Sequence, residues 1–378
     1  MRRSGVMILA AGCVAAGAAS PAAAQESHDG LDPADIARIE ALVGERIEAQ
    51  GIPGLSIAVV ADGRIAWSRG FGLADVENEV PATPRTAYRT ASIGKPMTAV
   101  AVLRLAARGR LDLDAPVQRY CPAFPDKGSP TPVTARRLLA HMGGIRHYEP
   151  QTQEEETYST THYESVVEAL ASFADDPLAY EPGTASHYST FGYNLLGCAI
   201  EGASGMPYLR YMADSVFAVA GMSATRDDDP RAIIPHRAGG YTRDSTGALG
   251  NARFTDMSNR LPAGGFVTTA EDLARFAIAF MDDRLLADST RRAMLEPQRT
   301  TSGEVVPFGL GWGLFPGEEW YGLKEAFHGG QTPGVSGMLY LIPERRFAVA
   351  LLSNLQGMDE RVDLSARIAV IVLDLEAP

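Results

Sequence analysis

The sequence predicts an α+β protein, in which an antiparallel sheet is flanked by helices and joined to a mainly helical subdomain. Strand patterns gather at both ends of the chain, at residues 55–70 and 311–353, and the sequence between them is mostly helical in pattern. The chain has 378 residues, of which 46% are hydrophobic and 21% charged, enough for one large packed core.

The N-terminal strand pattern is a hairpin that follows an amphipathic helix. Apolar residues recur at helical spacing over 35–50, with Pro33 as a start signal. Residues 55–60 form an apolar β run, and the Asp-Gly turn at 62–63 leads into a second strand at 64–70. A helix beside an antiparallel hairpin predicts a sheet with helices packed on it.

The first 24 residues have the layout of a cleaved secretory signal. Arg2 and Arg3 precede an apolar run over residues 6–19, and three alanines at 22–24 stand before Gln25. The run is too short and too rich in alanine and glycine to form a stable membrane span. We therefore expect a signal peptide over 1–24 and a periplasmic or secreted protein.

The three cysteines bear on anchoring and on redox state. A lipoprotein anchor at Cys13 is the less favoured alternative, because Ala10 stands where a lipobox prefers leucine. Cys198 lies in the pattern of a buried helix, so we expect a packed free thiol there. A single disulfide between Cys121 and Cys198 stays open for an oxidising compartment.

The chain is acidic, with a net charge of −12. Removal of residues 1–24 takes two of the 34 basic residues and none of the 46 acidic ones, which leaves a net charge of −14. This charge argues against nucleic acid and anionic membranes as partners. The seven histidines show no ligand spacing of the HExxH or CxxC kind, so we predict neither a metal nor a cofactor.

The central part of the chain is predicted to be a series of helices joined by irregular segments. The acidic run at 154–156 is typical of a solvated loop, with a place at a substrate rim as the minority interpretation. Residues 261–265 are expected to be a loop with close backbone approach. Helices are expected after Ser92 to about residue 108, after Thr134 to 141, and at about 164–174, 194–202, 205–221 and 270–282.

Strand patterns return near the C-terminus and a helix follows them. We see neither a repeat nor a long linker, so the parts should pack as one unit. The α/β part is expected at about 31–85 and 305–378, and the helical part at about 86–304. The late strands are expected at about 311–315, 326–328, 337–342 and 347–353, and the last helix at about 360–375.

Ser92 and Lys95 stand three residues apart at the predicted start of a helix, where both side chains share one face. A serine hydroxyl needs a base to act as a nucleophile at neutral pH. A lysine is such a base once burial or cationic neighbours keep it neutral. The pair is a candidate nucleophile and base; taken alone, a helix start with a solvated lysine is the simpler interpretation.

Three short motifs follow one another along the chain: Ser92-Ile93-Gly94-Lys95, then Tyr188-Ser189-Thr190, then His328-Gly329-Gly330. This order resembles the serine β-lactamase and penicillin-binding protein superfamily, especially its class C type. The resemblance implies a β-lactamase/transpeptidase-like fold and one catalytic domain over 31–378. Further segments resemble connecting signatures of that family, at 111–114, 138–141, 181–183, 261–265 and 329–334.

Within the superfamily, residues 144–149 and 188–193 look most like those of the mitochondrial serine β-lactamase-like protein. That subgroup is associated with peptidase activity and with filament assembly. The resemblance therefore implies a bacterial-type, exported relative with a small-molecule or peptide substrate, and a homo-oligomer or filament stays open.

The resemblance also implies roles for individual residues. Ser92 forms an acyl-enzyme that water clears, and Lys95 and Tyr188 carry protons; which of the two is the base stays open. The backbone amides of Ser92 and Gln331 are the expected oxyanion hole, and each such donor is worth ~3 kcal/mol of transition-state stabilisation. His141 is expected to be structural.

The remaining site positions depart from the family pattern. His328, Gly329 and Gly330 stand in the places of lysine, threonine and glycine in the family's Lys-Thr-Gly triad. A fixed charge and a hydroxyl are thereby missing where a β-lactam carboxylate docks. Thr190 replaces the asparagine of the Tyr-x-Asn element. These substitutions imply weak or no β-lactamase activity and favour ester or peptide substrates.

Several functions stay open on this basis. The leading one is an exported serine hydrolase that acts on peptides, amides or esters through an acyl-enzyme. A D-alanyl carboxypeptidase and a small-ester hydrolase are alternatives of the same class. A non-catalytic scaffold or filament-forming protein is the alternative of another class. The loop residues 146–148 line the cleft only in the minority interpretation, since loops often carry function.

Overall fold

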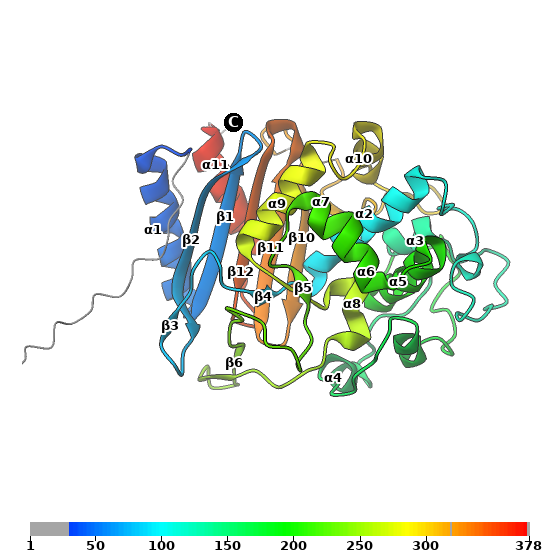
Figure 1. Ribbon diagram of the computed structural model, residues 1–378. Coiled ribbons are helices and arrows are strands. Elements are labelled where there is room, and N and C mark those ends of the chain that lie inside the picture. Colours follow the sequence, from blue (N-terminus) through cyan, green and yellow to red (C-terminus); the bar gives the residue numbers. More distant parts are fainter. Residues whose placement is uncertain (1–29, 318–319, 376–378) are drawn as a thin grey trace, which may run out of the picture.

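The computed structural model describes residues 30–317 and 320–375, so the predicted signal peptide lies outside the described residues (Figure 1). A seven-stranded antiparallel sheet, in the order β3-β2-β1-β12-β11-β10-β9, forms the centre. Helices cover both of its faces, and a mainly helical part adjoins it, which confirms the predicted α+β class. The strands of the sheet are β1 (Gly54–Ala61), β2 (Arg64–Asp75), β3 (Val80–Pro81), β9 (Gly313–Leu314), β10 (Ala326–Thr332), β11 (Val335–Ile342) and β12 (Phe347–Ser353).

Strand β1 joins the two ends of the chain. It pairs with β2 through the predicted hairpin, whose turn residues Asp62 and Gly63 have positive φ angles of 52° and 74°. Such angles match the twist of an antiparallel pair. On its other side β1 pairs with β12, from Leu55 opposite Ser353 to Val60 opposite Ala348. The hairpin and the C-terminal strands therefore form one sheet.

The central strand β12 is buried on both faces of the sheet. Successive side chains point to opposite faces. One face receives Val349 and Leu351, which pack with helices α1 (Pro33–Gln50) and α11 (Arg361–Leu373). The other face receives Ala350 and Leu352, which belong to a larger core shared with the helical part. Small residues on that second face let helix α9 (Ala270–Met281) lie close to β1 and β12.

Helix α2 (Gly94–Ala107) is the central helix of the molecule. It follows the 3₁₀ turn η1 (Ala91–Ile93) and is buried on all sides over residues 94–103. It packs against α5 (Thr190–Ser204) and α8 (Leu261–Gly264), while η1 lies against β10. The start of this helix therefore lies where the sheet meets the helical part (Figure 1).

The rest of the helical part consists of short elements. The helices are α3 (Ala135–Leu139), α4 (Gln153–Thr157), α6 (Tyr208–Met212), α7 (Ala218–Ala220) and α10 (Asp288–Met294), with a π-helical turn η4 (Ala213–Phe217) between α6 and α7. The 3₁₀ turns are η2 (Val117–Arg119), η3 (Glu168–Ser172), η5 (Ser258–Arg260) and η6 (Pro343–Arg345). Two small sheets contain β4 (Tyr88–Arg89), β8 (Phe266–Thr268) and β5 (Arg226–Asp227), and β6 (Tyr241–Arg243) with β7 (Leu249–Asn251).

Two local predictions were wrong. Residues 261–264 form the helix α8 rather than a loop, because Pro262 suits a first helical turn. The expected close backbone approach is nevertheless present: a Cβ on Gly264 would lie 1.7 Å from the carbonyl oxygen of Ala91. The helix expected at 164–174 is shortened to η3, since Ser165 Oγ accepts the amide of Glu168 and starts the turn there.

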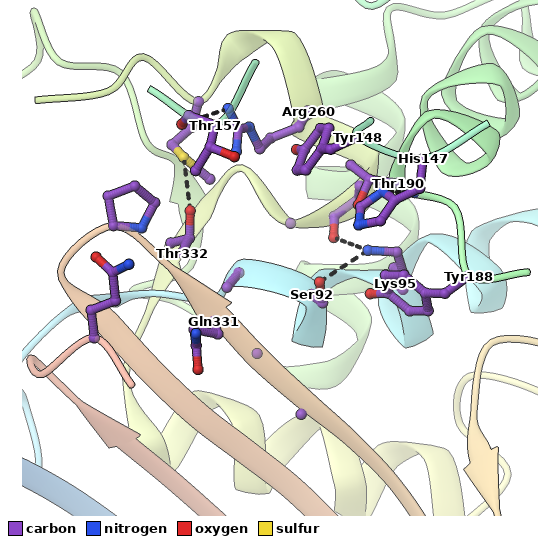
Figure 2. Close-up of a pocket in the computed structure, with 18 of the residues that line it drawn as sticks. Ser92, Lys95, His147, Tyr148, Thr157, Tyr188, Thr190, Arg260, Gln331 and Thr332 are labelled. Atoms are coloured by element: carbon purple, nitrogen blue, oxygen red, sulfur yellow. Dashed lines mark hydrogen bonds between the residues drawn. The ribbon is translucent and has the colours of Figure 1, made fainter. Parts of the chain in front are cut away.

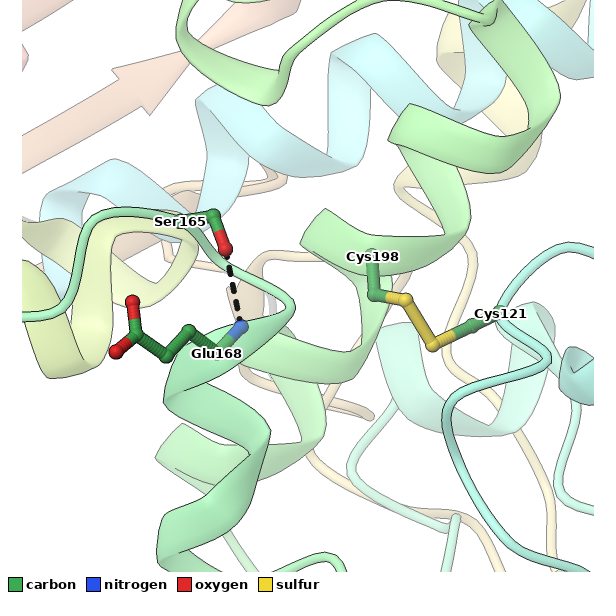
Figure 3. Close-up of a disulfide and its surroundings, with 4 residues drawn as sticks. All are labelled: Cys121, Ser165, Glu168 and Cys198. Carbon is green, nitrogen blue, oxygen red and sulfur yellow. Dashed lines mark hydrogen bonds between the residues drawn. A yellow bond between two sulfur atoms is a disulfide. The ribbon is translucent and has the colours of Figure 1, made fainter.

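The prediction of a free thiol at Cys198 was also wrong. Cys198 on α5 forms a disulfide with Cys121, which follows η2 (Figure 3). The partners are 77 residues apart in the chain, and the fold brings their Cα atoms to 5.4 Å. The bond fixes the segment after α2 to the helix that starts beside the candidate site.

Candidate active site

A cleft of about 940 Å³ opens where η1 and α2 meet strand β10 and the helical part. The structure brings together three segments that lie far apart in the sequence. All eight residues predicted for the site line the cleft: Ser92, Lys95, Tyr188, Thr190, His328, Gly329, Gly330 and Gln331.

Ser92 and Lys95 are in direct contact. The Nζ of Lys95 lies 3.0 Å from the Oγ of Ser92 and donates to the carbonyl oxygen of Ala263 at 3.3 Å (Figure 2). Lys95 is completely buried, so the simpler interpretation of a helix start with a solvated lysine is wrong. Burial, together with the positive charge of Arg260, lowers the pKa of Lys95 well below its usual 10.5. This shift favours the neutral form of the side chain, whose lone pair can accept a proton.

Tyr188 completes the group around the serine. Its ring lies under the lysine, with Nζ of Lys95 4.7 Å from the ring centroid. Burial raises the pKa of the phenol, and a hydrogen bond with Ser92 opposes that rise only in part. The phenol therefore keeps its proton at neutral pH, and Tyr188 can act as a donor beside Ser92.

Two histidines hold Tyr188 in place. The ring of His141 lies 4.4 Å from that of Tyr188, and its Nδ1 accepts the amide hydrogen of Ser189 at 3.1 Å. The ring of His147 meets Tyr188 edge-on at 5.4 Å, and its Nδ1 accepts the amide of Thr190 at 3.3 Å. Both contacts fix the start of α5, so His141 has the structural place that was expected for it.

His328 faces the same group from strand β10. Its Nδ1 lies 2.8 Å from the carbonyl oxygen of Gly329, and because a carbonyl only accepts, Nδ1 carries the proton. Burial is the main cause that lowers the pKa of His328 to about 3, and Lys95 contributes whenever its amine is protonated. The imidazole is therefore neutral near pH 7, with Nε2 left as an acceptor. No fixed positive charge stands at this position.

Gly330 allows strand β10 to approach the serine closely. A Cβ at this position would lie 2.5 Å from the carbonyl oxygen of Thr90, two residues before Ser92. Gln331 follows it, with an exposed side chain. Ser92 itself is the second residue of η1, where backbone amides have no partner within the helix. The two expected oxyanion donors thus lie on adjacent segments.

Sequence reasoning missed Arg260, which lines the cleft although it is only 6% exposed. One feature of the sequence could have pointed to Arg260: it directly precedes residues 261–265, a segment that resembles a family signature. In the structure, the carbonyl oxygen of Ala263 in that segment accepts a hydrogen bond from Lys95. The minority interpretation of 146–148 is confirmed for His147 and Tyr148, which line the cleft, but not for Arg146, which is not among the lining residues.

The acidic run is solvated only in part. Glu154 lines the cleft, whereas Glu156 turns inward and pairs with Arg146 at 2.9 Å. A place at a substrate rim was the minority interpretation of this run, and of these two residues only Glu154 lines the cleft. The run therefore forms part of the cleft wall through α4.

Within residues 30–317 and 320–375, no group of three or more His, Cys, Asp or Glu side chains is placed to hold a metal ion. Among the same residues, no helix is both long and apolar enough to cross a membrane.

Comparison with known proteins agrees with this geometry. A family model described as Beta-lactamase matches residues 39–373. The chain belongs to the Beta-lactamase family. The human mitochondrial serine beta-lactamase-like protein LACTB is 31% identical, over 82% of this chain and 74% of that protein. Penicillin-binding protein 4* of Bacillus subtilis is 28% identical, over 82% of this chain and 69% of that protein. The resemblance noted in the sequence is thereby confirmed.

Solved structures of this family share the fold. An octameric penicillin-binding protein homologue from Pyrococcus abyssi has a TM-score of 0.78 and 25% identity, covering 90% of this chain and 78% of that one. A D-amino acid amidase from Ochrobactrum anthropi has a TM-score of 0.75 and 26% identity, covering 89% of this chain and 98% of that one. The β-lactamase/transpeptidase-like fold expected for this chain is therefore confirmed, and the family includes serine hydrolases with amidase members.

Proposed function

We propose that this protein is an exported serine hydrolase that cleaves peptide, amide or ester substrates through an acyl-enzyme on Ser92. The contact between the buried amine of Lys95 and the hydroxyl of Ser92 carries the proposal. A buried lysine is costly to a fold, and a neutral amine beside a serine hydroxyl is the arrangement that activates a nucleophile.

In the first step, neutral Lys95 accepts the proton of the Ser92 hydroxyl while Oγ attacks the substrate carbonyl carbon. The carbonyl oxygen becomes an oxyanion, which the amides of Ser92 and Gln331 bind. The directions of the pKa shifts favour Lys95 over Tyr188 as the base, because burial favours the neutral amine and the protonated phenol.

In the second step, Tyr188 donates its phenolic proton to the leaving nitrogen or oxygen as the bond to the carbonyl carbon breaks. The ammonium of Lys95 then returns a proton to the phenolate. Water attacks the acyl-enzyme by the same route, and Ser92 recovers its proton. Each group therefore begins and ends the cycle in the protonation state that its surroundings favour.

The same geometry argues for weak or absent β-lactamase activity. His328 is neutral, and Gly329 and Thr190 replace the hydroxyl and the amide that the family pattern has there. The amidase among the structural relatives supports a simple amide or ester as the substrate class. A D-alanyl carboxypeptidase activity belongs to the same proposal.

Export and self-association are further parts of the proposal. The disulfide between Cys121 and Cys198 suits an oxidising compartment, and residues 1–24 have the layout of a signal peptide. The Pyrococcus abyssi homologue is described as octameric, which supports testing this chain for a homo-oligomer or filament.

The proposal is tested by turnover of aminoacyl p-nitroanilides and p-nitrophenyl esters by purified residues 25–378. The matched variant is Ser92→Ala, and Ser129→Ala in the irregular segment before α3 is the control. We expect hydrolysis by the wild type and the control, and none above background by Ser92→Ala. Equal turnover by Ser92→Ala would refute the proposal. No turnover by a folded wild type, with a filament in the electron microscope, would favour the scaffold instead.

A further inference from the structure

Arg260 is a buried cation whose partners in the structure are all neutral. Its Nε donates to the Oδ1 of Asn259 at 2.7 Å, and its Nη2 donates to the carbonyl oxygens of Glu156 and Thr157, the latter at 2.9 Å. No ion pair joins Arg260 to a carboxylate of the described residues. A guanidinium that is 6% exposed and lacks an anionic partner is unfavourable unless an anion reaches it.

The remaining nitrogen of Arg260 is available to a ligand. Its Nη1 makes no hydrogen bond to a described residue. It is also not among the fully buried polar atoms that lack a partner, so this nitrogen is not sealed from solvent. The residue lines the cleft. Nη1 therefore has donors that no described residue uses, on a side chain that lines the cleft.

Arg260 has a fixed place in the cleft wall. Its guanidinium carbon lies 5.4 Å from the ring centroid of Tyr148, which also lines the cleft. Figure 2 shows Arg260 beside Tyr148, on the side of the cleft away from Gln331. The charge of Arg260 lowers the pKa of both Lys95 and His147, so it acts within the site and not at a distant rim.

The charge balance of the cleft is opposite to that of the whole chain. Its described lining includes Arg253, Arg260 and Arg361, but Glu154 is its one acid, and Glu154 is paired with Arg253 at 2.8 Å. Arg361 donates to the carbonyl oxygen of Gly330 at 2.6 Å. With Lys95 neutral, the cleft is cationic in a protein whose net charge is −12.

We propose that Arg260 binds a carboxylate of the substrate, so that the cleft selects molecules bearing a free acid on the side of Tyr148. The group is an acidic side chain or a terminal carboxylate. The inference rests on the proposed hydrolase function only where it calls the ligand a substrate; binding of the carboxylate itself does not require hydrolysis. This position is separate from His328 and Gly329, since Arg260 projects from the helical part and they belong to strand β10.

A purely structural role is the competing explanation. In that case Arg260 only ties α4 to η5 through the carbonyls of Glu156 and Thr157. Removal of Arg260 would then weaken the binding of acids and of their neutral amides by the same factor. Recognition of a carboxylate would instead remove the preference for the acid over its neutral amide, which is the quantity to measure.

The experiment measures ligand affinity in the Ser92→Ala background, where no turnover occurs. One ligand pair is N-acetyl-glutamate methylamide and its glutamine counterpart; the second is N-acetyl-alanine and its amide, each in L and D form. The variants are Arg260→Met and Arg260→Lys. Arg210→Met, on the exposed face of α6, is the matched control.

With Arg260 present, we expect the acid of one pair to bind about tenfold or more tighter than its amide, because hydrogen bonds to charged groups have that worth. Arg260→Met should bring the ratio near one, Arg210→Met should leave it unchanged, and added salt should reduce it. The pair that shows the preference identifies the source of the carboxylate.

A ratio near one with Arg260 present, or a preference that survives in Arg260→Met, would overturn the proposal. If Arg260→Met does not fold, Arg260→Lys decides: it keeps the charge without the planar fork, and an unreduced preference would contradict recognition by the guanidinium. If the acid is preferred but the wild type hydrolyses nothing, the carboxylate site stands and the hydrolase proposal fails.

Discussion

The Nζ of Lys95 lies 3.0 Å from the Oγ of Ser92, and Lys95 is completely buried. The apolar helix that surrounds the lysine removes water, and the nearby guanidinium of Arg260 disfavours a second positive charge. Both effects act on the protonation of the amine and therefore on the nucleophile. Substitutions at this pair, and in the packing that maintains it, should therefore change activity and stability in defined directions.

Lys95→Arg should abolish turnover, with a loss of about 10³-fold or more in kcat/KM. An arginine places a permanently protonated group at the position, which cannot accept a proton, so Ser92 loses its base. Steady-state hydrolysis of an ester tests this, with circular dichroism to show that the variant is folded. Activity within tenfold of the wild type would mean that another group accepts the proton.

Lys95→Met should make the protein more stable while removing activity. The unfolded chain protonates Lys95 below about pH 10.5, whereas the folded protein resists protonation until a much lower pH. The unfolded state therefore binds more protons in that window, and wild-type stability falls as the pH falls through it. Thermal unfolding should show a Tm gain of a few degrees at pH 7 that shrinks toward pH 10.5. A gain independent of pH would contradict a neutral buried lysine.

The pH profile of kcat/KM should have one acidic limb, set by Lys95, because activity requires the neutral amine and so falls as the pH is lowered. Arg260→Met should move this limb to higher pH, since the charge of Arg260 lowers the pKa of Lys95. The pKa of His328, at about 3, and that of His147, at about 4, place no step near pH 6.5. An unmoved limb in Arg260→Met would contradict this coupling.

Gly264→Ala should destabilise the protein by ~3 kcal/mol or more and reduce turnover. Gly264 has a φ of 144°, and an added Cβ would lie 1.7 Å from the carbonyl oxygen of Ala91, beside Ser92. Gly44→Ala is the matched control, because Gly44 lies in α1 with no atom within 4 Å of an added Cβ. That control should gain ~0.5–1 kcal/mol from helix propensity. Denaturant unfolding compares them, and equal effects would refute the packing argument.

The double variant Cys121→Ser/Cys198→Ser should lose ~2–5 kcal/mol of unfolding free energy, because the disulfide closes a loop between residues 77 apart. Reductant should lower the stability of the wild type to a similar level and leave the double variant unchanged. An effect of reductant on the double variant would show that it acts elsewhere than on this bond.

Much of the fold was predictable because its signals are local. The Asp-Gly turn and the apolar run over 55–60 predicted the hairpin, and β12 occupies the residues 347–353 expected for it. Helix α8 was missed because it is four residues long and ends in glycine, which disfavours helices elsewhere. The disulfide was missed because its two cysteines carry no spacing signal and meet only through packing of α5.

The site was predictable to a similar degree. Ser92 and Lys95 are neighbours on one helical turn, so their contact follows from sequence spacing. The burial of Arg260 does not follow from sequence spacing. It depends on hydrogen bonds to the carbonyl oxygens of Glu156 and Thr157, which lie more than 100 residues earlier in the chain. A single arginine in a sequence is ordinarily a surface residue, and only tertiary structure reveals this one inside the cleft.

The most direct test of an activated Ser92 is labelling with a fluorophosphonate, read as intact mass and by peptide mapping of residues 25–378. We predict one label per chain on Ser92, absent from Ser92→Ala and slowed at least about 10³-fold in Lys95→Arg. Labelling at another serine, or equal labelling of Ser92 with and without Lys95, would contradict the claim that the buried lysine activates this hydroxyl.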